Sequence, residues 1–240
     1  MGAGPLSVPA AVPATGSAPD GRDTPARAAH AVVALVVVVS LGVQLVLLLT
    51  GATDVNTGDS QAEVPVVTRL VRLFSYFTIQ SNLFVLAASV SLALAPRRDG
   101  RWWRVLRLDA LLGITVTGLV YWTLLAPTVE LHGAALATGL GFHLVAPLGT
   151  LVVWWLFGPR PRITTHTVAR AFVWPVAWVG GTLLHGAVTG WYPYPFLDVG
   201  VLGYPRALAA TAVVLALGLL VALVLRWLDG RRRPTEQPTG

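Results

Sequence analysis

The chain has 240 residues, of which 55% are hydrophobic and only 12% are charged. Soluble domains carry about 25% charged residues, so this composition excludes an ordinary soluble protein and indicates a membrane protein. The net charge of +6 comes from arginine, because the chain has no lysine. We expect this surplus to orient helices against lipid headgroups, and we expect no nucleic-acid partner. The absence of cysteine excludes disulfides, thiolate nucleophiles and cysteine-ligated metals.

The chain divides into a long apolar region between two tails. Residues 1–28 are rich in alanine, proline and glycine, which predicts a disordered tail, and residues 229–240 form a basic tail. The region 29–228 contains six stretches with the about 20 apolar residues that a spanning helix needs. They are 29–50, 73–95, 105–126, 134–157, 168–190 and 205–228. We interpret the first as a retained anchor, because it is too long for the core of a signal peptide.

Arginine placement predicts the orientation of these helices. With six spans, 14 of the 17 arginines fall on one side and only Arg69, Arg72 and Arg206 fall on the other. Positive residues concentrate on the cytoplasmic side of membrane proteins. We therefore predict an all-α, polytopic six-transmembrane-helix bundle, with both termini cytoplasmic.

The second predicted span carries unusual polarity in SYFTIQSNLF, residues 75–84. Lipid offers polar groups no hydrogen-bond partner, so they should face other helices or a cavity. Taken alone, such a stripe favours packing over a functional site, because serine and threonine often bond to the carbonyl one turn earlier. One face of the helix collects most of these groups: Ser75, Thr78, Ser81, Asn82 and Ser89.

Depth in the bilayer brings two histidines to the same layer. Thr78 lies six residues after Arg72, about 9 Å below the outer boundary at 1.5 Å per residue. His143 lies about 15 Å into the fourth span, and His185 lies about 9 Å from Trp191 by the same rise. Histidines inside a membrane indicate function by default. For His185, a neutral imidazole bonded to a backbone carbonyl is an equal alternative.

These residue types suit acyl transfer. A hydroxyl needs a base within hydrogen-bond reach, typically an imidazole, and Thr78 with His143 supplies that pair. The oxyanion needs hydrogen-bond donors, for which Asn82 and His185 are the candidates. No carboxylate lies at this depth to orient the histidine, so we expect a Thr/His dyad and not a triad. We expect no cofactor. A metal is the rival use of two histidines, but no third ligand stands at a spacing such as HExxH, and we predict none.

Three segments resemble a known family: FTIQSNL, GFHLVAPLGTLVVWW and HGAVTGWYPYPFLDVG. They are similar to bacterial Pr6Pr-type membrane proteins and, more distantly, to the androgen-induced and androgen-dependent TFPI-regulating proteins of animals, over about residues 30–228. The animal members are multi-span hydrolases that cleave fatty acid esters of hydroxy fatty acids with an intramembrane threonine and histidine. The resemblance implies Thr78 as the nucleophile and His143 as the catalytic histidine. Ser81 and Asn82 stand where the animal motif carries an aspartate.

We therefore expect an intramembrane hydrolase of fatty-acyl ester lipids, whose partners are the bilayer and a lipid-like substrate. Two alternatives stay open. The polar layer could bind or transport a lipid or small solute without chemistry, or the bundle could be structural, with Gly133, Ala137 and Gly141 as helix-contact positions. WYPYPFLD, residues 191–198, would be an interfacial anchor or a lid over the site. The sequence leaves the physiological substrate and the oligomeric state open.

Overall fold

The computed structural model describes residues 23–52 and 61–231. All regular secondary structure in this part of the chain is helical, and six helices there are long and apolar enough to cross a membrane. The prediction of an all-α six-span bundle is confirmed, and the protein is a multi-pass membrane protein. The spans are Asp23–Leu49, Phe77–Leu94, Arg101–Thr128, Gly133–Phe157, Thr165–Thr189 and Val199–Gly230.

Several spans consist of more than one helical segment. The first span is α1 (Asp23–Leu49). A short helix, α2 (Val66–Ser75), precedes the second span, α3 (Phe77–Leu94). The third span consists of α4 (Arg101–Val120), the π-helical turn η1 (Tyr121–Leu125) and the 3-10 turn η2 (Ala126–Thr128). The fourth span joins α5 (Gly133–Leu140), the π-helical turn η3 (Gly141–Val145) and α6 (Ala146–Phe157). The remaining segments are α7 (Thr165–Ala171), α8 (Val173–Thr189), the 3-10 turn η4 (Pro195–Leu197) and α9 (Val199–Gly230).

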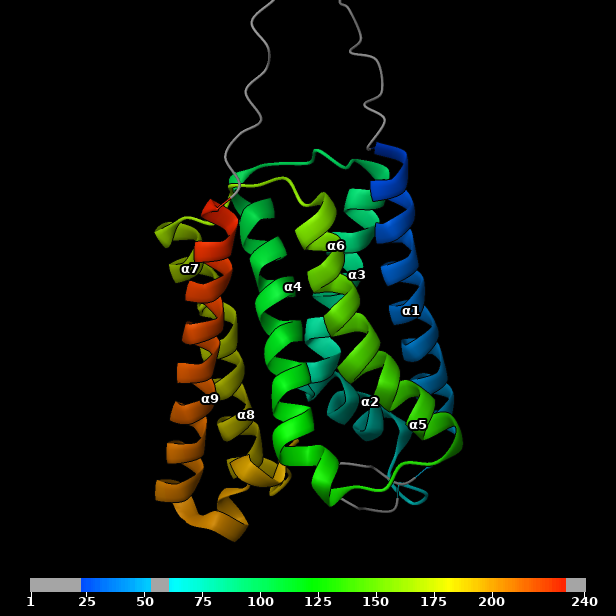
Figure 1. Cartoon of the computed structure of the whole chain (residues 1–240). Coiled ribbons are helices and arrows are strands. Elements are labelled where there is room, and N and C mark those ends of the chain that lie inside the picture. Colours follow the sequence, from blue (N-terminus) through cyan, green and yellow to red (C-terminus); the bar gives the residue numbers. More distant parts are fainter. Residues whose placement is uncertain (1–22, 53–60, 232–240) are drawn as a thin grey trace, which may run out of the picture.

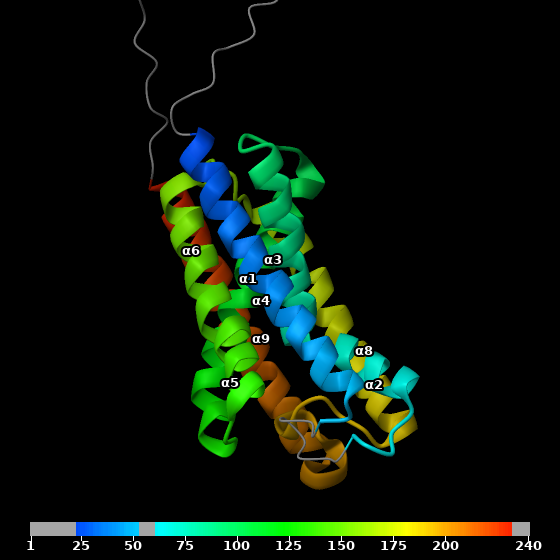
Figure 2. The ribbon, with the colours of Figure 1, turned by 90° about the vertical axis from the view of Figure 1, so that its right-hand side faces the viewer.

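Helix α4 is the centre of the bundle. It packs against α3, α6, α7 and α9, and its side chains Leu108, Leu112 and Ile114 are almost completely buried. Figure 1 shows α8 and α9 on one side of α4 and α1, α3 and α6 on the other. In the perpendicular view of Figure 2, α1 crosses in front of α3 and α4. The two groups of helices therefore share α4 as their common wall.

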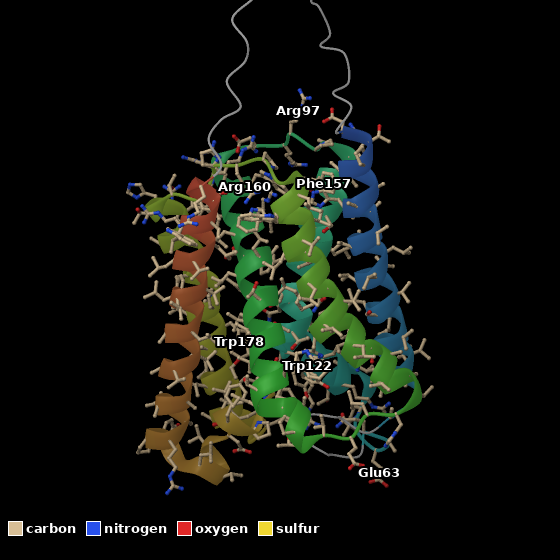
Figure 3. All side chains as sticks on the ribbon, viewed as in Figure 1. Glu63, Arg97, Trp122, Phe157, Arg160 and Trp178 are labelled. Atoms are coloured by element: carbon tan, nitrogen blue, oxygen red, sulfur yellow. The ribbon has the colours of Figure 1, made fainter. Side chains whose placement is uncertain are left out.

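The two ends of the bundle differ in charge. Helix α1 begins and α9 ends at the same end (Figure 1), as an even number of spans requires. Figure 3 shows Arg97 and Arg160 at that end and Glu63 at the opposite one. We call the first the arginine-rich end. There Arg104 donates two hydrogen bonds of 2.7 Å to Asp99, and this guanidinium holds the pKa of the Asp99 carboxyl well below its usual range.

The boundaries of three predicted segments differ from the structure. Helix α1 begins at Asp23, ahead of the predicted start at 29, and the rest of the predicted tail, residues 1–22, lies outside the described residues. Helix α9 continues to Gly230, and residues 232–240 also lie outside them. The predicted span 73–95 is broken at Tyr76, where ψ is 129°. Helix α3 therefore starts at Phe77, and α2 forms a separate short helix before it.

Arg69 holds α2 in place. Its side chain is buried and donates hydrogen bonds to the carbonyls of Leu48, Ala62 and Val64 at 2.9, 3.0 and 2.7 Å. A buried guanidinium needs such acceptors, because an unpaired charge away from water is strongly unfavourable. Arg69 thus ties α2 to the end of α1, at the mouth of the region that contains Thr78.

The fourth span approaches α1 closely at Gly141. A Cβ atom there would collide with the Ser40 hydroxyl oxygen, so a larger residue would require the Ser40 side chain to move. Gly133 and Ala137, which the sequence places on the same contact face, are exposed in this chain. Gly141 begins η3, and this π-helical turn changes the face on which His143, two residues later, lies. Such turns occur frequently at functional sites.

Candidate active site

Thr78 is the second residue of α3. Because the chain is extended at Tyr76, the first backbone N–H groups of this 18-residue helix have no carbonyl one turn earlier to bond to. The Thr78 N–H instead donates to the Tyr194 hydroxyl at 3.2 Å. The break therefore places a threonine hydroxyl and the positive end of a helix dipole at one point inside the bundle.

His143 faces Thr78 from the fourth span. Its Nε2 lies 3.4 Å from the Thr78 hydroxyl oxygen, and its Nδ1 lies 3.0 Å from the Gly139 carbonyl oxygen. A carbonyl only accepts, so Nδ1 carries the proton in this bond. In the neutral ring Nε2 is then an acceptor, and the Thr78 hydroxyl donates to it. The carbonyl of Gly139 orients the ring as a carboxylate does in a catalytic triad.

Aromatic side chains from η1 hold the His143 segment. The Tyr121 ring stacks on the imidazole with 3.8 Å between centroids and 12° between planes. The neighbouring Trp122 donates a hydrogen bond of 3.0 Å to the His143 carbonyl. Figure 3 shows Trp122 between the two ends of the bundle and nearer to the end of Glu63. Ring stacking and backbone bonding together leave the imidazole little rotational freedom.

Tyr194 completes the group around Thr78. Its hydroxyl oxygen lies 3.3 Å from the Thr78 hydroxyl oxygen, although 116 residues separate the two in sequence. The ring is 5% exposed, contacts Tyr76 edge-on at 5.6 Å and stacks on Phe196 at 5.3 Å. The segment after α8 thus folds back into the bundle and buries its aromatic rings instead of presenting them at the surface. Sequence reasoning missed this residue, although a tyrosine between two prolines beside the polar layer was a usable signal.

Asn82 stands one turn after Thr78 but supports it from within the same helix. Its side-chain amide donates a hydrogen bond of 2.9 Å to the Thr78 carbonyl. The side chain is fully buried, and its Oδ1 has no hydrogen-bond partner among the described residues. The remaining polar residues of the stripe are either buried in the bundle, as Ser81 and Ser89 are, or hydrogen-bonded within their own helix, as Ser75 is to the Val71 carbonyl. The Thr117 hydroxyl lies 3.3 Å from that of Ser81, which is completely buried.

The structure does not bring His185 to Thr78. The His185 ring lines a different hollow, together with Gln80, Trp174 and Trp178, and meets the Trp191 ring edge-on at 5.8 Å. Gln80 itself accepts a hydrogen bond of 2.8 Å from the Trp174 indole. His185 and His143 therefore share a predicted depth but lie on different sides of α3.

Two cavities meet at Thr78. The first, which we call the apolar cavity, lies between α3, α4, α8 and α9 and comprises about 710 Å³, counted with the space at its openings. The second, the polar cavity, lies between α1, α2, α3 and the fourth span and comprises about 930 Å³ by the same measure. Thr78 and Tyr121 line both, Tyr194 lines the apolar cavity and His143 lines the polar one. The hydroxyl of Thr78 is therefore reachable from both sides.

Within the part of the chain that the structure describes, no group of three His, Asp or Glu side chains lies close enough to hold a metal ion. Comparison with protein-family models, with curated proteins and with solved structures finds no match to this chain. The family resemblance of the three sequence segments stays a prediction. What the site can do must therefore be argued from its own geometry.

Proposed function

We propose that this protein is an intramembrane hydrolase of fatty-acyl esters, with Thr78 as the nucleophile and His143 as the general base. The observation that carries the proposal is the contact between Thr78 and His143 at the junction of two cavities. A hydroxyl becomes a competent nucleophile when a neutral imidazole within hydrogen-bond reach accepts its proton. The resemblance to Pr6Pr-type proteins and their animal relatives agrees with this assignment.

In the first step, the Thr78 oxygen attacks the ester carbonyl carbon while its proton passes to His143 Nε2. The carbonyl oxygen gains negative charge, which donors close to Thr78 stabilise. The candidate donors are the Tyr194 hydroxyl, which lies 3.3 Å from the Thr78 hydroxyl oxygen, and the Thr78 backbone N–H, which donates to Tyr194 in the absence of substrate. The ester C–O bond then breaks, the imidazolium returns the proton to the leaving alcohol, and the acyl group remains on Thr78.

In the second step, water attacks the acyl-threonine ester with His143 again as the base. The proton of the water passes to Nε2 and then to the Thr78 oxygen as the C–O bond between the acyl group and Thr78 breaks. The products are the free fatty acid and the regenerated hydroxyl. Each step needs only the imidazole and the hydrogen-bond donors of this chain.

The apolar cavity suits the acyl chain of the substrate. Its walls on the central span run from Leu112 to Leu125, which corresponds to about 20 Å of helix. Side chains from α8 and α9, including Trp178 and Val214, close the other side. The alcohol part of the ester would lie in the polar cavity. We place the protein in a bacterial plasma membrane, with the arginine-rich end in the cytoplasm and the site in the outer half.

The test compares Thr78→Val with the full-length wild-type protein in lipid nanodiscs. Valine keeps the branched shape of threonine and removes only the hydroxyl. With fluorescent acyl esters and a fluorophosphonate probe, we expect the variant to lose both turnover and labelling. Thr115→Val is the matched control, because within the described part of the chain the Thr115 hydroxyl bonds to the Leu111 carbonyl of its own helix and to no other group.

Equal turnover by wild type and Thr78→Val would refute the proposed chemistry. Saturable binding of the esters without product in either protein would instead assign the cavities to lipid binding or transport. That result would favour the alternative in which the polar layer holds a lipid or small solute without reacting with it.

A further inference from the structure

Arg107 is a buried cation far from the Thr78 site. It lies six residues into α4 from the arginine-rich end, about 9 Å along the helix. The residue is 7% exposed, and neither Nη1 nor Nη2 has a hydrogen-bond partner among the described residues. A guanidinium carries five N–H donors, and leaving them unpaired inside a protein is strongly unfavourable. Such a group calls for an anionic acceptor.

A cavity beside Arg107 offers further hydrogen-bond donors. It comprises about 300 Å³, counted with the space at its openings, and is lined by one polar side chain from each of four helices, namely His30 of α1, Ser89 of α3, Arg107 of α4 and Thr150 of α6. We call it the Arg107 cavity. The Thr150 hydroxyl oxygen is buried without a partner in the described residues, and His30 and Ser89 are 6% and 4% exposed. All four groups can donate, and no carboxylate lines this cavity.

The charges nearby leave Arg107 uncompensated. On its other side Arg107 lines a second space with Arg104, Arg162 and Asp229. Arg104 is paired with Asp99, and Arg162 lies 3.4 Å from the same carboxylate. The Asp229 carboxylate accepts from the backbone N–H groups of Arg162 and Ile163. Neither acid forms an ion pair with Arg107, and the Asp229 Oδ1 is likewise buried without a hydrogen-bond partner in the described residues. The three arginines and two acids therefore carry a net charge of +1.

We propose that the Arg107 cavity is a binding site for a small monovalent anion, with chloride as its simplest occupant. One guanidinium balances one negative charge, and the hydroxyls of Ser89 and Thr150 with the His30 ring supply neutral donors around it. The remaining lining is apolar, from residues such as Val33, Leu92 and Leu111. A small, weakly hydrated anion suits such a lining better than a phosphate dianion, which would need more than one cation.

The bound anion would link α1, α3, α4 and α6 through their polar side chains. Because α1, α3, α4 and the fourth span also form the walls around Thr78, the anion stabilises the bundle without taking part in the reaction. The site is independent of the proposed hydrolase activity. Its signature is a dependence of stability on the kind of anion at constant ionic strength.

The experiment measures the thermal unfolding midpoint of the full-length protein in nanodiscs of a neutral phosphatidylcholine. Potassium chloride is compared with potassium gluconate, whose large anion cannot enter the cavity, at equal ionic strength. A ligand that binds only the folded state raises the midpoint, and for a domain of this size we expect chloride to raise it by about 2–4 °C. We expect Arg107→Gln to abolish this difference, and to unfold at a higher temperature than wild type in gluconate.

Two further variants separate the anion site from general effects of charge. Arg101→Gln removes an exposed arginine of the same helix, which packs over Trp102 at 5.4 Å, and should keep the full chloride effect. Thr150→Val removes one donor without a charge change and should reduce the effect by about half. If Arg107→Gln does not fold, the chloride effect in Thr150→Val tests the proposal in its place.

Three outcomes would overturn the proposal. Wild type could show the same midpoint in chloride and gluconate. Arg107→Gln and Thr150→Val could both retain the complete chloride effect. Anionic phosphatidylglycerol nanodiscs in gluconate could reproduce the chloride effect in wild type and not in Arg107→Gln, which would identify a lipid headgroup as the ligand.

Discussion

The apolar and polar cavities share Thr78 but differ in what they offer a ligand. The apolar cavity is walled by the leucine, valine and aromatic side chains of α4, α8 and α9. The polar cavity contains two glutamines and two arginines from α1, α2 and the segment between them: Gln44, Gln61, Arg69 and Arg72. An ester of a fatty acid has the same asymmetry, with a long apolar chain on one side of the carbonyl. Under the proposed function, the contrast assigns the ester carbonyl to the junction, where Thr78 lies.

The two arginines of the polar cavity are not equivalent. Arg69 donates to three backbone carbonyls and holds α2 against α1. Arg72 instead lies over the Trp191 ring, with 5.2 Å from its guanidinium carbon to the ring centroid. A cation over an aromatic face keeps its N–H groups directed away from the ring and open to other partners. Arg72 is therefore the charge in this cavity that a ligand can use.

Replacing His143 should lower the rate of hydrolysis most, because it removes the base that both proposed chemical steps use. His143→Asn keeps a donor toward the Gly139 carbonyl and loses only Nε2. We expect kcat for acyl esters to fall by about 10³-fold, the usual contribution of a general base. His185→Asn is the matched control, since His185 lines a separate hollow, and its activity should be that of wild type. The measurement is steady-state hydrolysis of a fluorescent ester in nanodiscs.

A loss of activity in both histidine variants would contradict the assignment of the base to His143 alone. Similar activity in His143→Asn and wild type would remove the base from the proposed mechanism. Thermal unfolding of both variants shows whether either substitution acts through stability.

Tyr194→Phe should have the next largest effect. It removes the hydroxyl beside Thr78 and keeps the ring that packs on Tyr76 and Phe196. Loss of one oxyanion donor lowers kcat by about 10²-fold, with little change in KM. Tyr192→Phe is the control, because the Tyr192 ring packs against Gly186 and lines neither cavity. A change in KM with constant kcat would show that Tyr194 contributes to binding instead of to the transition state.

Hydropathy and arginine placement were sufficient to predict the number and type of the spans. The pair of Thr78 and His143 was also accessible, because polar groups in hydrocarbon must find partners at their own depth. The depth argument nevertheless assumed a continuous helix through Tyr76, where the chain is extended. It reached the correct neighbours because α2 is short and ends only three residues before Thr78.

Other features of the site depend on packing that no local pattern encodes. The π-helical turn that contains His143 shifts the helical period by one residue, so the face of the imidazole could not be read from 3.6-residue spacing. The position of His185 on the far side of α3 depends on how α8 docks. Tyr194 reaches Thr78 only because the segment after α8 folds into the bundle. The aromatic composition of this segment was equally compatible with an anchor at the membrane surface.

Filling the apolar cavity should change which esters are hydrolysed. Val214 lines this cavity from α9, whereas its neighbour Val213 is 68% exposed on the outside of the bundle. Val214→Trp should lower kcat/KM for long-chain esters by more than about tenfold and affect short-chain esters little, because a filled pocket rejects extra methylenes. Val213→Trp should keep the wild-type preference. Equal loss for all chain lengths in Val214→Trp would place the acyl chain elsewhere.

Removing the charge of the polar cavity should have the smallest effect. Arg72→Gln keeps a polar side chain and removes the cation, so it should lower kcat/KM only for esters whose alcohol part carries a free carboxylate. A half-exposed ion pair contributes about 0.4–1 kcal/mol, which corresponds to about a twofold to fivefold loss. Neutral esters should be hydrolysed at the wild-type rate, and added salt should weaken the difference because it screens the charge. If neutral and anionic esters lose activity equally, Arg72 acts by packing on Trp191, and the polar cavity selects its ligand by shape instead of charge.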